Sequence, residues 1–295
     1  MNTREIVSME SEIQQAIEDH AEETTTLAGE KVQVLYEERA ITVAGLYGLS
    51  LGEVFKQAMR QNILPYRYIR NQGIISIKDQ LKLAVSRVAV VGAGGLGGNV
   101  IILLARTGIG HLVVIDADKF DETNLNRQAL CVRENIGRPK AAEAVEKVKE
   151  INPAVEVIAH VGRLTSENAG EILRDVDVIV DALDNVLDRF VLERTAKELS
   201  VPMVHAGIAG FEGQLMSIFP QDPGLQLVYG DPEKWQRPKR TPEVVLGVPA
   251  VTASLLATLQ AMEVLKILLG KGEAMRNKIL RPDLETGEFH HIVFA

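Results

Sequence analysis

The chain has 295 residues, of which 46% are hydrophobic and 24% are charged, and its formal net charge is −8. This composition is typical of a globular protein with a substantial core, and the acidic balance argues against general nucleic-acid binding. The single cysteine, Cys131, excludes an internal disulfide and a zinc site made of several thiolates. We see neither an apolar run near the roughly 20 residues of a membrane span nor an apolar signal core, and we expect a cytoplasmic protein.

The first part of the chain has two helical patterns. Residues 4–22 carry apolar side chains on one stripe, and Ser50 with Glu53 has the spacing of a capping box that opens a second helix. We therefore expect residues 1–62 to form an N-terminal extension that is largely helical. Residues 63–295 are expected to form the main domain.

Strand and helix patterns alternate regularly from residue 86 onward. Strands are expected at 87–91, 111–115, 155–159, 177–181 and 202–206, with helices between them at 97–107, 138–151, 166–174 and 186–199. Later patterns predict a strand at 213–219, a long apolar helix at about 248–269 and a hairpin of 277–281 with 288–294. The fold class is therefore α/β: a Rossmann-like, doubly wound, mostly parallel sheet with antiparallel C-terminal strands.

A glycine motif follows the first of these strands. Gly92, Gly94 and Gly97 have G-x-G-x-x-G spacing, with Gly95 between them, and strand, glycine turn and helix together present backbone N–H groups to a phosphate. Asp116 ends the next strand, where a carboxylate meets a ribose. NAD and ATP both carry a ribose, so these residues predict a nucleotide without choosing which. A tight turn with no ligand is the alternative.

Two cations favour ATP over NAD. Arg127 and Lys140 are expected at the carboxyl edge of the sheet, and a triphosphate under attack needs more positive charge than a bound dinucleotide. Asp184 closes a later strand at the same edge. It is either a ligand of Mg²⁺ or the N-cap of the following helix.

These motifs, in this order, closely resemble those of the MoeB/ThiF/HesA family, which are relatives of the ubiquitin-activating enzymes. The resemblance covers about residues 65–295. Its blocks are Gly92–Gly97, Asp116–Asp118, Asn124–Gln128, Gly137–Lys140, Asn152–Pro153, Asp181–Asn185, Val201–Pro202, Gly207, Phe211–Gln214 and Gln260–Lys266.

The resemblance implies an adenylyltransferase. Its substrate would be the C-terminal glycine carboxylate of a small ubiquitin-fold sulfur carrier ending in Gly-Gly, activated with ATP and Mg²⁺. Carried over by position, the Gly94 turn contacts phosphate, Asp116 holds the ribose and Asp184 binds Mg²⁺. The implied catalytic residues are Arg127, Lys140, Arg70 and Asp184. The implied nucleotide-binding residues are Gly92, Gly94, Gly95, Gly97, Asp116, Asp118, Asn124, Arg127, Gln128, Lys140, Asp184 and Asn185.

The same resemblance implies a homodimer, because Arg70 matches an arginine that reaches the partner subunit's nucleotide. Asn71 replaces the glutamine usual after that arginine, and Arg67 is expected to be structural. Many relatives also carry two Cys-x-x-Cys pairs for zinc and a cysteine that forms a thioester or persulfide. This chain has neither, so we expect no zinc, a packed Cys131, and transfer of the acyl-adenylate to another acceptor.

Other functions remain as alternatives. A tRNA-modifying dehydratase of the same superfamily would keep the ATP site, although the acidic net charge counts against an RNA substrate. An NAD-dependent oxidoreductase is favoured by the glycine motif alone. A non-catalytic scaffold that binds the carrier is the fourth interpretation, and retention of Arg127, Lys140 and Asp184 argues against it. A basic loop at 234–240 is either a docking surface for an acidic carrier or an ordinary solvated loop.

Overall fold

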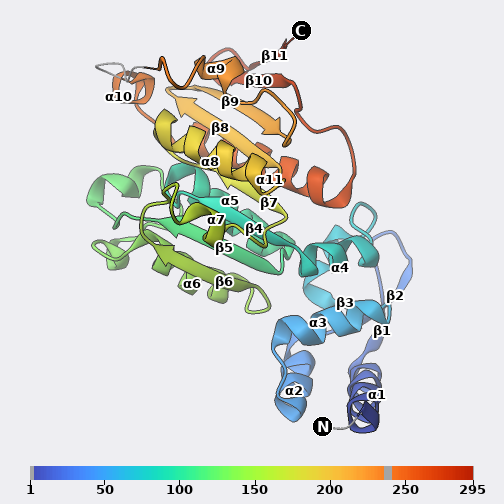
Figure 1. Ribbon diagram of the computed structural model, residues 1–295. Coiled ribbons are helices and arrows are strands. Elements are labelled where there is room, and N and C mark those ends of the chain that lie inside the picture. Colours follow the sequence, from blue (N-terminus) through green and yellow to red (C-terminus); the bar gives the residue numbers. More distant parts are fainter. Residues whose placement is uncertain (1–2, 236–240, 295) are drawn as a thin grey trace.

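An eight-stranded sheet with helices on both faces forms the body of the protein, and a smaller module projects from one end (Figure 1). The computed structural model describes residues 3–235 and 241–294. The strand order is β11-β10-β9-β8-β7-β4-β5-β6. The strands are β4 (Arg87–Val91), β5 (His111–Asp116), β6 (Glu156–Val161), β7 (Val178–Asp181), β8 (Met203–Ala209), β9 (Glu212–Ile218), β10 (Lys278–Asp283) and β11 (Glu288–Val293).

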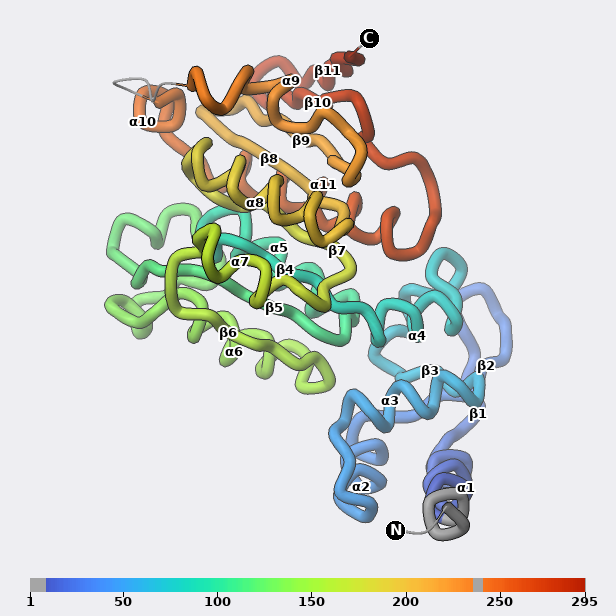
Figure 2. Tube along the Cα trace, viewed as in Figure 1, coloured from blue at the N-terminus to red at the C-terminus, as the bar shows by residue number. Residues whose placement is uncertain are grey.

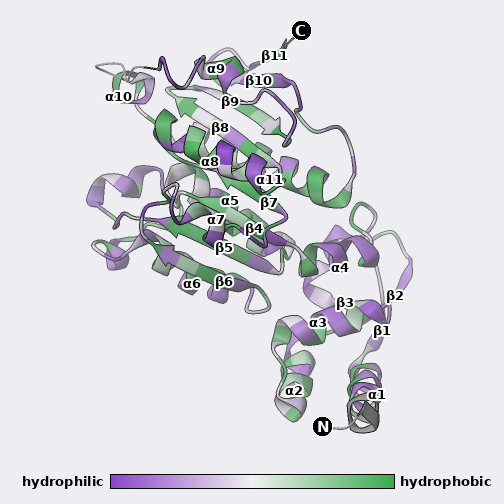
Figure 3. Ribbon diagram, in the orientation of Figure 1, coloured by the Kyte–Doolittle hydropathy of each residue, from purple (hydrophilic) through white to green (hydrophobic). Residues whose placement is uncertain are grey.

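The pairing of these strands confirms the predicted fold class. Strands β4 to β8 pair in parallel, whereas β8 to β11 form an antiparallel series. Side chains alternate between two cores: Val88 and Val90 join the apolar cluster that contains α5 and α11, while Ala89 and Val91 join the one that contains α8. Burial of both faces explains the continuous apolar runs, which Figure 3 shows in β4 and β5.

Helices connect the strands much as the sequence predicts. They are α5 (Gly95–Thr107), α6 (Lys140–Ile151), α7 (Ala169–Ile172), α8 (Val186–Glu198) and α11 (Ala250–Leu269). Helix α7 is shorter than the expected 166–174. The first residues of the predicted range lie before the helix, in a turn where the Asn168 side chain accepts a hydrogen bond from the Thr165 backbone N–H at 2.8 Å. Two short helices, α9 (Gln226–Tyr229) and α10 (Pro242–Leu246), lie in the stretch that looked irregular.

Helix α11 corrects one expectation. By length and composition it is apolar enough to cross a membrane, although the sequence seemed to contain no such run. Half of this apolar stretch is buried inside the protein, and the helix packs against α5, β8 and β9. A core helix passes the same length and composition test, and its packing identifies α11 as one.

The N-terminal module is built from helices and a small sheet. Its elements are α1 (Thr3–His20), β1 (Glu22–Thr25), β2 (Lys31–Leu35), α2 (Glu37–Tyr47), α3 (Leu51–Arg60) and β3 (Leu64–Pro65). Ser50 caps α3 as predicted, but the three-stranded sheet β1-β2-β3 and α2 were not foreseen. The module has its own apolar cluster, with Ile17 and Phe55 at its centre. The 3₁₀ helix η1 (Tyr66–Asn71) and α4 (Ile77–Val85) connect it to the large sheet, as the tube in Figure 2 shows.

Candidate functional site

A cavity of about 760 Å³ lies at the carboxyl ends of β4, β5 and β7. This is the edge where doubly wound sheets bind their ligands. The predicted site residues that line it are Gly92, Gly94, Gly95, Asp116, Asp118, Arg127, Gln128, Lys140, Asp184 and Asn185. Three other predicted residues, Gly97, Asn124 and Arg70, are not among the described residues of its lining.

The glycine turn brings the backbone close to the cavity. Gly92 has φ +98°, and a Cβ there would lie 2.5 Å from the Ala182 carbonyl oxygen. A Cβ on Gly97 would lie 1.7 Å from the Gly92 carbonyl oxygen, so only glycine allows α5 to start this close to the strand. Gly94 is the N-cap and supplies no side-chain cap. The first N–H groups of α5 are therefore open to an anion in the cavity.

Asp116 fixes the floor of the cavity. Its two carboxylate oxygens accept hydrogen bonds from the backbone N–H groups of Ala93 and Asp118, each at 2.7 Å. Burial raises the pKa of Asp116, while these N–H donors and the nearby Lys140 ammonium act in the opposite direction. Each carboxylate oxygen has a second lone pair, and this leaves Asp116 able to accept from a ribose hydroxyl.

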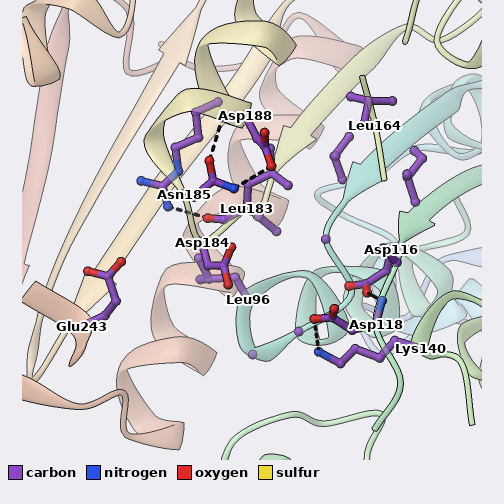
Figure 4. A pocket seen from close by; sticks show the side chains of 18 of the residues that line it. Leu96, Asp116, Asp118, Lys140, Leu164, Leu183, Asp184, Asn185, Asp188 and Glu243 are labelled. Atoms are coloured by element: carbon purple, nitrogen blue, oxygen red, sulfur yellow. Dashed lines mark hydrogen bonds and ion pairs between the residues drawn. The ribbon is translucent and has the colours of Figure 1, made fainter. Parts of the chain in front are cut away.

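Lys140 is a buried cation at the start of a helix. Its side chain is 8% exposed, and Nζ lies 3.1 Å from Oδ2 of Asp118, whose side chain is 70% exposed (Figure 4). A positive charge in the first turn of α6 opposes the helix dipole. The position of Lys140 is therefore unfavourable for the stability of the helix, but it places a positive charge in the cavity wall.

Arg127 supplies a second positive charge. It follows the 3₁₀ helix η2 (Glu122–Asn126), and its guanidinium donates to the Thr123 carbonyl at 3.1 Å and to Oδ1 of Asn126 at 2.9 Å. Within residues 3–235 and 241–294, no carboxylate forms an ion pair with Arg127. Its charge is thus available to an anionic ligand.

Gln128 carries an unpaired acceptor into the same region. The residue is only 6% exposed, its amide lies against Gly94, and its buried Oε1 has no hydrogen-bond partner among the described residues. A buried polar atom without a partner is uncommon in folded proteins. Its position in the cavity wall is consistent with a ligand contact.

Asn124 has a structural position. It is buried, and its Oδ1 accepts a hydrogen bond from the Asp121 backbone N–H at 3.1 Å. This contact is part of the capping box at the start of η2, the helix that leads to Arg127. Direct contact of Asn124 with a nucleotide remains a prediction from the resemblance.

The structure shows that Asp184 is not the N-cap of the following helix. Asn185, not Asp184, caps α8: its side chain accepts from the Asp188 N–H at 2.9 Å. The Asp184 carboxylate is exposed and receives no hydrogen bond or ion pair from the described residues. Figure 4 shows it at the centre of the cavity, between the Asp118–Lys140 pair and Glu243.

A second cavity of about 520 Å³ adjoins the first and shares Asp184 and Asn185 with it. It extends over β8 and β9, where Gly207 and Gly213 form part of its wall. A Cβ on Gly213 would lie 2.4 Å from Leu256 Cδ2. The other described residues that line this second cavity are Val186, Arg189, Ile208, Ala209, Glu212, Gln214, Tyr229, Trp235, Thr241, Pro242, Glu243, Leu246 and Arg281.

Sequence reasoning missed Arg189, a buried arginine in the walls of both cavities. Its guanidinium donates to the Tyr229 hydroxyl and to the Leu183 carbonyl, both at 2.5 Å, and Nε lies 3.7 Å from Oδ2 of the fully buried Asp181. The bond to Leu183 holds the backbone beside Asp184. The available signal was the i,i+4 spacing from Asn185, which places Arg189 on the same side of α8.

Among the described residues, Cys131 lines neither cavity, whereas the basic loop contributes one residue to both. Cys131 is buried as expected, and burial raises the pKa of its thiol, which disfavours the reactive thiolate. Residues 236–240 of the basic loop lie outside the described residues. The loop residue Trp235 lines both cavities.

The comparisons with known proteins identify the family. Residues 67–294 match the model of the ThiF family. The chain belongs to the ThiF family. It is 38% identical over 218 residues to the SAMP-activating enzyme E1 of Haloferax volcanii, covering 74% of this chain and 80% of that protein. It is also 36% identical over 239 residues to the sulfur carrier protein adenylyltransferase of Thermus thermophilus, covering 79% and 84%.

The similarity in fold to a solved structure extends beyond the region that matches the ThiF-family model. The crystal structure of PaaA superimposes with a TM-score of 0.65 and 18% identity, covering 93% of this chain and 98% of PaaA. Since the matched share exceeds the ThiF region, the similarity in fold includes much of the N-terminal module. Both the predicted family and the predicted fold class are thereby confirmed.

Proposed function

We propose that this ThiF-family protein adenylates the C-terminal glycine carboxylate of a small ubiquitin-fold sulfur carrier. The observation that carries the proposal is the pair of adjoining cavities. One combines an anion-binding turn with Lys140 and Arg127, and the other leads away from Asp184 over two glycine-bearing strands. The names of the two curated relatives, both enzymes that activate carrier proteins, support this choice of substrate.

ATP fits the first cavity from its floor upward. The α5 N-terminus would receive phosphate oxygens, and Asp116 would accept from the ribose. Lys140 and Arg127 would then neutralise the charge that builds on the α-phosphate and on the departing pyrophosphate. Oε1 of Gln128, which has no partner among the described residues, fits a contact to the bound nucleotide or its water.

A magnesium ion fits this arrangement as a companion of the nucleotide. No group of three or more His, Cys, Asp or Glu side chains suited to a metal occurs among residues 3–235 and 241–294. Mg²⁺ is commonly held by one or two carboxylates together with substrate phosphates and water. Asp184, exposed at the centre of the cavity, is the residue that would hold it.

The second cavity would take the carrier's tail. The small Gly207 leaves room there for an extended Gly-Gly segment whose carboxylate reaches Asp184, and the backbone of Gly213 forms part of the wall. A glycine carboxylate is ionised at neutral pH and needs no general base. One of its oxygens attacks the α-phosphorus, the bond from that phosphorus to the α,β-bridging oxygen breaks, and pyrophosphate leaves with the electron pair.

The proposal includes a homodimer. Arg70 is exposed on η1 and lies outside the cavity of its own chain among the described lining residues. Helix α11 also exposes apolar side chains, with Val251 60% and Met262 48% exposed, which a second copy could cover. In such a dimer Arg70 would reach the partner's nucleotide. We place the reaction in the cytoplasm, where ATP is supplied.

Carrier-dependent exchange of labelled pyrophosphate into ATP tests the proposal. Arg127→Ala and Lys140→Ala should each reduce exchange by about 10²- to 10³-fold, because each removes charge that stabilises the transition state. Lys147→Ala is the matched control. Lys147 also lies on α6, but it is outside the cavity lining and its Nζ is 2.6 Å from Oε2 of Glu150. Exchange driven by tRNA, turnover of NAD, or full exchange in either cavity variant would contradict the proposal.

A further inference from the structure

An ion pair bridges two walls of the first cavity. Arg163 lies in the loop after β6, and its guanidinium donates to both carboxylate oxygens of Asp188 in the first turn of α8. The Nη2 distances are 2.7 Å to Oδ1 and 2.9 Å to Oδ2, and Nε is 3.2 Å from Oδ2. Both residues line the cavity. This geometry is the two-pronged pairing that gives arginine–carboxylate contacts their direction.

Each end of the bridge is held in place. Asp188 also accepts from Nδ2 of Asn185 at 2.6 Å, so its carboxylate has little freedom to turn. The Arg163 carbonyl accepts from Nδ2 of Asn168 at 3.0 Å, which anchors the loop. The Asp188 carboxylate and the backbone of the Arg163 loop are therefore anchored, and the Arg163 side chain that joins them is 67% exposed.

The sheet order shows what the bridge spans. In the order β7-β4-β5-β6, α8 follows β7 and the Arg163 loop follows β6. Three strand spacings of about 4.8 Å separate these strands, so the bridge closes a gap of roughly 14 Å over the ends of β4 and β5. The end of β5 carries Asp116.

The part of the cavity beneath the bridge is suited to a flat, apolar ring. With the ribose at Asp116 and the phosphates at the α5 N-terminus, the base is left with the region lined by Ala117, Leu164, Leu183 and Leu187. Arg163 brings a planar guanidinium to this region, and such groups stack on aromatic rings. Its charge is balanced by Asp188, whereas Lys140 and Arg127 give the phosphate end a positive charge.

The geometry points to the Arg163–Asp188 bridge as the specificity determinant for the nucleotide base. This inference rests on the proposed function and names the residues that select adenine within it. Guanine presents two adjacent donors, N1–H and the 2-amino group, which a free carboxylate accepts side by side. Because the Arg163 guanidinium already lies along the two-oxygen edge of Asp188, it blocks the side-by-side approach that guanine needs, and the base region offers a stacking surface instead.

Nucleotide affinities measured without any carrier test this inference. Arg163→Met removes the stacking guanidinium and exposes the Asp188 carboxylate. We expect the Kd for Mg-ATP to rise about tenfold and the ratio of ATP to GTP affinity to fall by at least about tenfold. Adding Asp188→Asn to Arg163→Met removes the carboxylate, so the gain toward GTP should disappear while the loss for ATP remains.

Arg194→Met is the matched control, because Arg194 lies on α8 outside the cavity lining and pairs with Glu198 at 4.0 Å. An affinity ratio in Arg163→Met equal to that of this control would overturn the inference. So would a gain toward GTP that persists in the double variant. Since these affinities need no carrier, they remain measurable if carrier-dependent exchange fails and the proposed substrate is wrong.

Discussion

At the scale of single residues, His205 is the buried group with the most direct consequence for pH dependence. Its ring is 1% exposed on β8, and Nδ1 lies 2.7 Å from Oδ2 of Asp181. Nε2 lies 3.2 Å from the Gln214 amide and 3.3 Å from the Tyr229 hydroxyl, and the Arg189 guanidinium is close by. Burial lowers the pKa of His205, so the folded protein holds this ring neutral near neutral pH.

The free energy of unfolding should therefore fall on acidification. Below the ordinary histidine pKa of about 6.5, the unfolded chain binds a proton that folded His205 does not, which gives a slope of up to about 1.4 kcal/mol per pH unit. Urea unfolding at a series of pH values from about 5 to about 7.5, which spans the ordinary histidine pKa, measures this slope. His205→Gln should flatten the slope, leaving the smaller contribution of His111, whose pKa burial also lowers. An unchanged slope in the variant would assign the pH dependence to other groups.

At the scale of elements, replacing either of two helical glycines with alanine should change the stability of the protein in opposite directions. Gly97→Ala would place a Cβ 1.7 Å from the Gly92 carbonyl oxygen, so α5 must move away from β4, at a cost of about 3 kcal/mol or more. Gly45 lies inside α2 with no atom within 4 Å of an added Cβ. Gly45→Ala should thus stabilise the protein by about 0.5 to 1 kcal/mol. Thermal unfolding of both variants compares them, and equal effects would show that the glycine turn is not sterically fixed.

Some helices and strands could be predicted from the sequence and others could not. The central strands β4, β5, β7 and β8 and the helix α11 were predictable because burial makes them apolar over the lengths typical of a strand and of a helix. The sheet of the N-terminal module was not, because β1 is polar and β3 has only two residues, so their pairing with β2 depends on tertiary contacts. Helix α7 was overestimated because residues 166–168 belong to a turn that the Asn168 side chain closes by accepting from the Thr165 N–H, and the helix begins only at Ala169.

The candidate site divides in a similar way. Glycine turn, Asp116, Lys140 and Asp184 could be placed from sequence because parallel strands bring their carboxyl ends to one edge. Arg163 and Asp188 could not be paired in advance. They lie 25 positions apart on segments that follow non-adjacent strands, and only the strand order shows that their side chains meet.

At the scale of the whole molecule, the position of Arg70 makes the proposed dimer testable. Arg70 lies on η1 between the N-terminal module and α4, and it is outside the lining of its own cavity among the described residues. If it completes the site of a second copy, Arg70→Ala and Lys140→Ala should each inactivate their own homodimer. A mixed dimer of the two variants then contains one fully intact site, formed by Lys140 of one subunit and Arg70 of the other.

Unfolding and refolding the two variants together at equal amounts should restore about a quarter of wild-type exchange activity, since half of the randomly formed dimers are mixed and each has one working site of two. Two controls fix the interpretation: each variant refolded alone gives the background, and wild type refolded in the same way gives the full value. If Arg70 acted within its own chain, every subunit in the mixture would carry one damaged site. Activity would then stay at the background of the separate variants, and the shared site would be excluded.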